Sequence, residues 1–232
     1  MSTISETLEL WGGPECTIVR IGDQFRNELE ETGHLGRIED LDSIAEVGIR
    51  TLRYPVLWET TSPHDPDECD WRWSDERLAR LKELDMQPVA GLVHHGSGPR
   101  YTDLLDRRFP TLLARHAERV ARRYPSIEMF TPVNEPLTTA RFSGLYGHWY
   151  PHGRDQATFL RALVTECTAV VLAMRAIRTV RPDAKLVQTE DLGKAFGTPL
   201  LSYQAELENE RRWLSLDLLC GRVDPHHPGT RS

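Results

Sequence analysis

The chain has 232 residues, of which 39% are apolar and 27% charged, and its formal net charge is −7. This length allows one sizeable hydrophobic core or at most two small ones. The mild acidity argues against nucleic acid or an anionic membrane as the main partner, and no apolar run approaches the roughly 18 residues of a membrane span.

Residues 1–9 are polar and have neither a cationic start nor an apolar core, so no secretory signal is expected. The cysteines, Cys16, Cys69, Cys167 and Cys220, are widely spaced and form no C-x-x-C pair. This spacing indicates reduced thiols rather than a disulfide framework or a zinc site. Together these features favour a cytoplasmic protein.

Short apolar runs alternate along the chain with segments of helical period. Residues 8–11 predict a weak strand that ends in a Gly-Gly-Pro turn. A helix over 35–47, with Gly48 as its C-terminal cap, leads to a second strand over 49–54. Ser74 is the expected N-cap of the next helix, which leads to a third strand over 88–93.

The second half of the chain continues this alternation. A helix with Pro110 in its first turn leads to a fourth strand over 127–133. A long helix over 156–180 is followed by a fifth strand over 185–189. The region after residue 199 is predicted to be helical, and residues 224–232 to be an unstructured end.

Strands that alternate with helices imply right-handed βαβ units and a parallel sheet. No linker, low-complexity stretch or short repeat divides the chain, so residues 1–232 are expected to form a single domain. A closed eight-fold barrel takes ~250 residues or more. The sequence therefore predicts an α/β fold of the TIM-barrel type that contains the first five βα units. Its open sheet edges would be covered by the rest of a longer barrel or by another copy of the chain.

Polar residues gather where the predicted strands end. Arg53 closes the second strand, His94-His95 follow the third, and Asn134-Glu135 follow the fourth. Parallel barrels build their active sites at the C-terminal ends of strands. A carboxylate there suits a general acid, and the neighbouring Asn can bond to a sugar hydroxyl. The glycine-rich segment 96–98 is expected to be flexible, and Glu190-Asp191 end the fifth strand.

Residues 142–153 form a loop rich in aromatic and His side chains, including Tyr146, Trp149 and Tyr150. Such a loop beside a carboxylate suits stacking on sugar faces. It equally suits a purely structural lid over the barrel end, and the sequence leaves both readings open.

Several motifs resemble glycoside hydrolase family 1, the β-glucosidase family. Residues 131–136 look like its T-x-N-E-P motif and residues 53–58 like its R-x-S-x-x-W segment. Residues 93–95 are similar to its L-x-H-W stretch, residues 144–153 to its G-Y-x-x-G-x-x-x-P-G loop, and residues 11–12 to its opening W-G. The resemblance runs from about residue 11 to residue 187. The region also resembles glycosidase-like segments that precede sugar-nucleotide reductase domains in longer proteins.

The chain departs from the family pattern at four points. Pro55 stands in place of a Ser, Gly96 in place of a Trp, and Val19 near the place of a Gln. The family's E-N-G nucleophile motif does not occur, because in the family it lies on the seventh strand, beyond residue 232. No G-x-G-x-x-G dinucleotide fingerprint is present either.

The resemblance implies retaining hydrolysis of O-glycosidic bonds of a small-molecule glycoside or oligosaccharide, without a cofactor or metal. Glu135 would be the acid/base, Asn134 would hold the sugar 2-hydroxyl and His95 a ring hydroxyl. Tyr146 and Trp149 would contact the substrate. Arg53 would orient a carboxylate.

Alternatives remain at this stage. Arg53 is equally suited to a structural ion pair. Glu190 would either replace the missing nucleophile or, as a helix-start residue, support the site. The whole segment would be either the acid/base part of a glycosidase or a catalytically inactive carbohydrate-binding segment of a larger sugar-metabolism protein. We expect residues 1–232 alone to be inactive.

Overall fold

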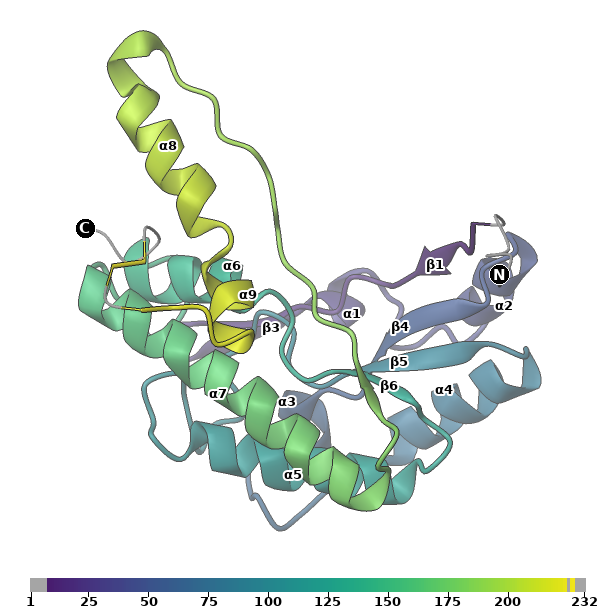
Figure 1. Cartoon of the computed structure of the whole chain (residues 1–232). Coiled ribbons are helices and arrows are strands. Elements are labelled where there is room, and N and C mark those ends of the chain that lie inside the picture. Colours follow the sequence, from purple (N-terminus) through teal and green to yellow (C-terminus); the bar gives the residue numbers. More distant parts are fainter. Residues whose placement is uncertain (1–7, 225, 228–232) are drawn as a thin grey trace.

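One parallel sheet organises the chain, which is described by a computed structural model over residues 8–224, 226 and 227. Its strands lie in the order β1-β4-β5-β6-β7 (Figure 1). They are β1 (Trp11–Gly12), β4 (Thr51–Pro55), β5 (Gln87–Gly91), β6 (Met129–Thr131) and β7 (Lys185–Leu186). Every neighbouring pair is parallel. The predicted α/β fold with five parallel strands is therefore confirmed. The expectations for residues 1–7, 225 and 228–232 lie outside the described residues.

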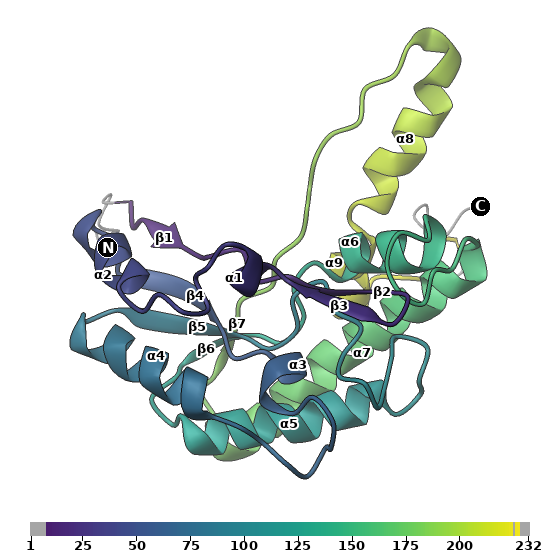
Figure 2. The ribbon, with the colours of Figure 1, turned by 180° about the vertical axis from the view of Figure 1, so that it is seen from behind.

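Helices cover one face of this sheet, whereas the other face has no helical layer in the described part of the chain (Figures 1 and 2). The covering helices are α2 (Asp40–Glu46), α4 (Arg72–Glu83), α5 (Phe109–Arg123) and α7 (Gln156–Val180). Leu52 and Tyr54 of β4 pack with Leu41 and Leu81 of α2 and α4. Phe130 of β6 belongs to the larger core formed with α5 and α7.

Helix α7 is long and apolar enough, by length and composition, to cross a membrane. However, its buried side chains, such as Phe159, Leu163 and Ile177, belong to the same core as those of α5. Packing within the protein thus accounts for the apolar character of this helix.

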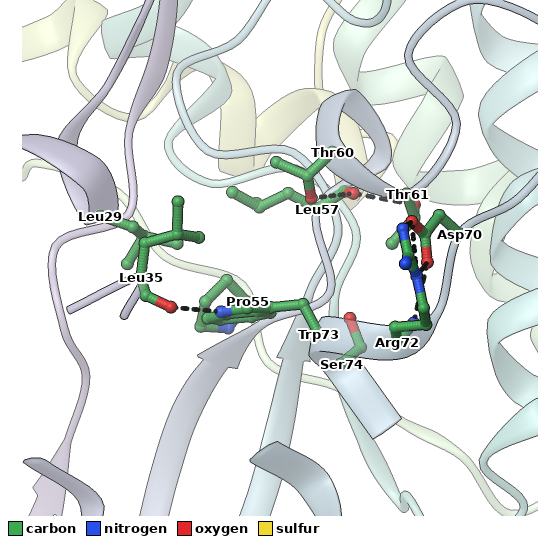
Figure 3. Close-up of a pocket in the computed structure, with 10 residues that line it drawn as sticks. All are labelled: Leu29, Leu35, Pro55, Leu57, Thr60, Thr61, Asp70, Arg72, Trp73 and Ser74. Carbon is green, nitrogen blue, oxygen red and sulfur yellow. Dashed lines mark hydrogen bonds and ion pairs between the residues drawn. The ribbon is translucent and has the colours of Figure 1, made fainter. Parts of the chain in front are cut away.

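Ser74 is not the N-cap of the helix that it was expected to begin. Helix α4 starts at Arg72 with Trp71 as its N-cap, and Ser74 lies inside the helix. Ser74 lines a cavity of about 320 Å³ together with Leu29, Leu57 and Trp73 (Figure 3). The Arg72 amide donates to Asp70 Oδ1 at 3.1 Å, so Asp70, ahead of the helix, takes the capping role that was expected of Ser74.

The structure also contains an antiparallel hairpin that was not predicted. It is formed by β2 (Ile18–Ile21) and β3 (Gln24–Asn27). Ile21 pairs with Gln24 across a two-residue turn, in which Gly22 has a φ of 59°. Gly-Asp is a turn of this kind, so the signal was present in the sequence. Two short helices, α1 (Glu28–Glu31) and α3 (Trp58–Thr61), were likewise not predicted.

The chain after β7 leaves the body of the protein. It runs as an extended segment to η2 (Pro199–Leu201) and α8 (Ser202–Arg211), which stands away from the sheet, and returns through α9 (Leu214–Leu219) (Figure 1). The prediction of helix after residue 199 is confirmed. Ser215 of α9 is fully buried.

Candidate functional site

The ends of β4, β5 and β6 bring together Arg53, His95, Asn134 and Glu135, here called the strand-end cluster. Beyond the regular strands, an isolated parallel bridge joins His94 to Asn134. The backbone N–H of Asn134 also donates to the Val93 carbonyl at 2.9 Å. The extended pairing of β5 and β6 therefore places His95 and Glu135 side by side.

Asn134 is the centre of this cluster and is almost fully buried. Its Oδ1 accepts hydrogen bonds from Arg53 Nη1 and, at 2.9 Å, from Thr189 Oγ1. Its Nδ2 donates to His95 Nε2 at 3.1 Å. These contacts orient the amide and leave its second N–H for another acceptor. Thr189, which the sequence reasoning did not single out, follows β7 and joins a third strand end to the site.

His95 is a neutral, oriented imidazole. Because Nε2 accepts from Asn134, the ring proton lies on Nδ1, which donates to Thr139 Oγ1 at 2.9 Å. Burial lowers the pKa of His95 to about 4. The 3.8 Å contact between His95 Nε2 and Glu135 Oε2 is thus not an ion pair near neutral pH. Both ring nitrogens are engaged within the protein, so a sugar contact through His95 stays a prediction.

Glu135 is half-buried and serves as the N-cap of α6 (Pro136–Ala140). Burial raises the pKa of its carboxyl group, and the negative charge of Asp191 adds to the effect, whereas Thr138 and Arg53 oppose it. A carboxyl group with a raised pKa keeps its proton closer to neutral pH, as a general acid requires. Its backbone is left-handed, with a φ of 45°.

Only one of the two aromatic residues proposed to contact a sugar lies at the cluster. The Trp149 ring is 5.3 Å from the His95 ring and 4.7 Å from that of Phe142. The Tyr146 hydroxyl instead accepts hydrogen bonds from Arg141 at 2.7 and 3.0 Å. The Tyr146 ring packs against Phe142 on η1, a π-helix over Arg141–Leu145. Substrate binding by Tyr146 remains a prediction, and its contacts are those of a residue that supports the loop.

The hairpin of β2 and β3 holds the far end of this aromatic loop. The Tyr150 amide donates to the Arg20 carbonyl at 2.8 Å, and the Arg20 guanidinium lies 3.8 Å from the centre of the Tyr150 ring. The Gly22 amide donates to His152 Nε2 at 2.9 Å. Tyr150 and His152 thus fasten the loop to the hairpin.

Glu15, Cys16 and His94 form a second polar group, next to His95. His94 Nε2 lies 3.3 Å from Glu15 Oε1, and its Nδ1 lies 3.1 Å from Cys16 Sγ. Burial lowers the pKa of His94 to about 3 and raises that of the Cys16 thiol. These shifts disfavour a reactive thiolate at Cys16, whose sulfur instead shares a hydrogen bond with the neutral His94 ring. Glu15 was missed, although it follows β1 as the other site residues follow their strands.

The segment 96–98 is not flexible, contrary to expectation. All its residues are buried, and they wrap around the buried side chain of Glu59, whose Oε1 accepts from the Gly98 amide at 3.2 Å. A Cβ on Gly96 would lie 1.9 Å from the same oxygen. A side chain at position 96 would displace the Glu59 carboxyl group and press against the Ile18 carbonyl, 3.0 Å away, so Gly96 serves close packing here rather than mobility.

Glu190 turns toward the helix start and accepts a hydrogen bond from the Leu137 amide of α6 at 2.8 Å. Of the two roles considered for Glu190, replacement of the nucleophile and support at a helix start, this contact is the one expected for helix-start support. Within residues 8–224, 226 and 227, no group of three or more His, Cys, Asp or Glu side chains has the arrangement of a metal site.

Solved structures of a β-glucosidase and of a second enzyme share this architecture. The family 1 β-glucosidase from Thermotoga maritima matches with a TM-score of 0.67 and 16% identity, over 84% of this chain and 50% of that one. The fold is that of about half a family 1 β-glucosidase. The AHE enzyme from Alicyclobacillus herbarius matches with a TM-score of 0.73 and 22% identity, over 83% of this chain and 46% of that one.

A complex of the Thermotoga maritima β-glucosidase with galacto-hydroximolactam matches with a TM-score of 0.69 and 15% identity, over 84% of this chain and 50% of that one. The chain thus spans about half the length of the structures that it matches. At these identities the likeness establishes the fold alone. No family model and no curated protein matches the sequence.

Proposed function

We propose that residues 1–232 carry the acid/base part of a retaining glycosidase site of the β-glucosidase type. Glu135 would be the acid/base, and the nucleophile would come from a carboxylate outside these residues. The observation that carries the proposal is the half-buried Glu135 at the end of β6, with a raised pKa, beside the oriented amide of Asn134.

In the first step, Glu135 donates its proton to the glycosidic oxygen as the bond to the anomeric carbon breaks. The second carboxylate, about 5–5.5 Å away in retaining enzymes, attacks that carbon and forms a glycosyl ester. In the second step, Glu135, now a carboxylate, takes a proton from the water that attacks the ester, and the sugar is released. A raised pKa suits the first step, because the acid must hold its proton at the working pH.

Asn134 and Trp149 would hold the sugar. The free N–H of Asn134 is the donor for the 2-hydroxyl, an interaction that strengthens in the transition state. Arg53 and Thr189 fix the other end of that amide, so the donor is preorganised. The Trp149 ring, beside His95, offers a face for stacking.

The ligand class follows by analogy. Thermotoga maritima β-glucosidase has been solved in complex with deoxynojirimycin and with glucoimidazole. We propose that this chain binds the same kind of pyranose-shaped molecule.

The test combines binding and turnover. Residues 1–232 are titrated with deoxynojirimycin by calorimetry and assayed with 4-nitrophenyl β-D-glucopyranoside. We expect no turnover, and we expect Glu135→Gln to weaken binding roughly tenfold through the loss of one charge-assisted hydrogen bond. The control is Glu128→Gln, which alters an exposed carboxylate that is paired with Arg181 before β6 and should change nothing.

A longer product of the same gene that supplies a second carboxylate should hydrolyse glucosides. Its turnover of substrates with poor leaving groups should fall by about 10²–10⁴-fold in Glu135→Gln. Sugar binding without turnover in every product would favour the inactive carbohydrate-binding segment instead. If neither binding nor turnover occurred, the proposal would be wrong.

A further inference from the structure

The backbone of Glu135 needs an external constraint. It adopts the left-handed conformation, with φ 45° and ψ 65°, at the N-cap of α6. Residues with a side chain rarely adopt this conformation, and it persists where the surrounding structure imposes it. The Glu135 side chain makes no capping hydrogen bond, and Pro136 has no N–H. The first N–H of α6 that can be held from outside therefore belongs to Leu137.

Glu190 supplies that hold. The Leu137 N–H donates to Glu190 Oε1 at 2.8 Å, and a carboxylate at this end of a helix also meets the favourable end of its dipole. The same carboxyl group also lies near Ser215 of α9, whose side chain favours its charged form and so opposes the rise of its pKa. The Glu190 side chain therefore lies between the start of α6 and α9.

A second carboxyl group, that of Glu166, lies close enough to Glu190 for the two charges to interact. Glu166 of α7 is fully buried, and neither of its oxygens has a hydrogen-bond partner within the described part of the chain. Burial and the neighbouring Glu190 raise the pKa of Glu166 well above its ordinary value. Burial also raises the pKa of Glu190 to about 7. Both carboxyl groups therefore hold a proton more tightly than an exposed Glu does, and near pH 7 Glu190 is about half ionised.

We propose that Glu190, backed by the buried carboxyl group of Glu166, is a positioning residue that fixes the first turn of α6 and with it the orientation of Glu135. The connection is short: Glu190 holds Leu137, which is two residues from Glu135. The inference rests on the proposed acid/base role of Glu135, but the anchoring itself is measurable without turnover.

The experiment uses residues 1–232 labelled with ¹³C at the Glu carboxyl groups and with ¹⁵N in the backbone. Hydrogen exchange of the Leu137 amide and the pKa of Glu135 are measured in the wild type, Glu190→Asp and Glu190→Gln. Asp keeps the charge but is one methylene shorter, whereas Gln keeps an acceptor oxygen at the same reach. Glu128→Gln is again the control.

We expect Glu190→Asp to speed Leu137 exchange by about tenfold or more, the loss of one charge-assisted hydrogen bond. The pKa of Glu135 should shift in the same variant. Glu190→Gln should keep the Leu137 exchange rate within about threefold of the wild-type rate, because a neutral hydrogen bond replaces the charged one. Wild-type values of both quantities in Glu190→Asp would overturn the proposal.

Glu166→Gln tests the backing carboxyl group and preserves its volume. The pKa of Glu190 should fall below its wild-type value of about 7, because an amide N–H in place of the Glu166 carboxyl group can donate to the Glu190 carboxylate and favour its charged form. An unchanged pKa would contradict the pairing, and it also provides the deciding result if Glu190→Asp does not fold. If the wild type bound no sugar, the proposed function would be refuted. The Leu137 exchange rate and the pKa values of Glu135 and Glu190 would still test the positioning role of Glu190.

Discussion

Burial keeps both histidines near the proposed site neutral. His94 and His95 have pKa values lowered to about 3 and 4, with burial as the main cause. Each is held by hydrogen bonds rather than by ion pairs, His95 through Asn134 and Thr139. The positive charge at the cluster comes from Arg53, which faces the Asn134 amide. The net charge of the cluster therefore depends on whether Glu135 is ionised.

The hydrogen-bond assignment of Asn134 leads to a residue-scale prediction. Asn134→Asp replaces the donor to His95 by a negatively charged carboxylate, which favours the imidazolium form of the ring. The pKa of His95 should therefore rise from about 4 by at least about one unit, measured by NMR titration of the imidazole Cε1–H signal. Thr189→Val, which removes a neutral contact to the same amide, should leave that pKa unchanged. Equal titration in both variants would rule out the assignment.

Glu59 predicts a pH-dependent stability. Burial raises its pKa to about 7 from an ordinary 4.5, so the folded state binds the proton more tightly than the unfolded state does. This contribution to stability is complete below pH 4.5 and is lost as the pH rises through 7, at most about 3 kcal/mol. The free energy of unfolding is measured in urea at pH 5 and pH 8 for the wild type and Glu59→Gln. Between these pH values the stability of Glu59→Gln relative to the wild type should increase by up to that amount. The same change in stability with pH in both proteins would contradict the prediction.

At the scale of elements, the aromatic loop is held between the β2–β3 hairpin and helix α7. The hairpin contacts Tyr150 and His152, while η1 lies against the first turn of α7. Gly144 makes this approach possible: a Cβ there would lie 2.7 Å from the Phe159 Cα atom. Backbone cannot move aside as a flexible side chain can, so the approach tolerates only glycine.

Gly144→Ala should therefore separate η1 from α7. We expect the free energy of unfolding to fall by about 1–3 kcal/mol, the usual effect of overpacking, and Trp149 fluorescence to change as the loop shifts. Gly36→Ala is the matched control, since its Cβ would have one neighbouring atom, at 4.0 Å. If Gly144→Ala were as stable as Gly36→Ala, the close approach would not be needed.

At the scale of the whole molecule, β1 and β7 are the outer strands of the parallel sheet. Apolar side chains lie exposed near the β7 edge and along the segment that leads to α8, with Leu186 at 37% and Phe196 at 85% exposure. Open strand edges with apolar neighbours favour pairing with another chain. The matched β-glucosidase and AHE enzyme structures are about twice as long as the segment that aligns with this chain.

We expect residues 1–232 to self-associate through the β7 edge in a concentration-dependent way. Sedimentation velocity should show this, and Leu186→Lys should weaken association by up to about 1 kcal/mol, because two copies would bring like charges together. Val164→Lys, a similar change at an exposed site on α7, should have no effect. A monomer at all concentrations would exclude this edge as an interface.

Much of the fold followed from local signals. The five strands, the helix start at Pro110 and the cap at Gly48, whose φ is 89°, agree with the pattern of apolar periods and turn residues. The Gly-Asp pair at residues 22–23 is typical of a two-residue hairpin turn, so the hairpin too is encoded locally. Ser74 shows the limit, because Asp70, four residues earlier, accepts the hydrogen bond from the first amide of α4, and both residue types favour a capping position.

By itself, the sequence determined the alternation of strands and helices, and hence which polar residues stand at strand ends, because both depend on near neighbours along the chain. Only the tertiary structure decided that Trp149 rather than Tyr146 lies beside His95. It alone turned Glu190 toward Leu137. The physical reason is that these choices depend on burial and on hydrogen bonds between segments far apart in the chain, which no local period encodes.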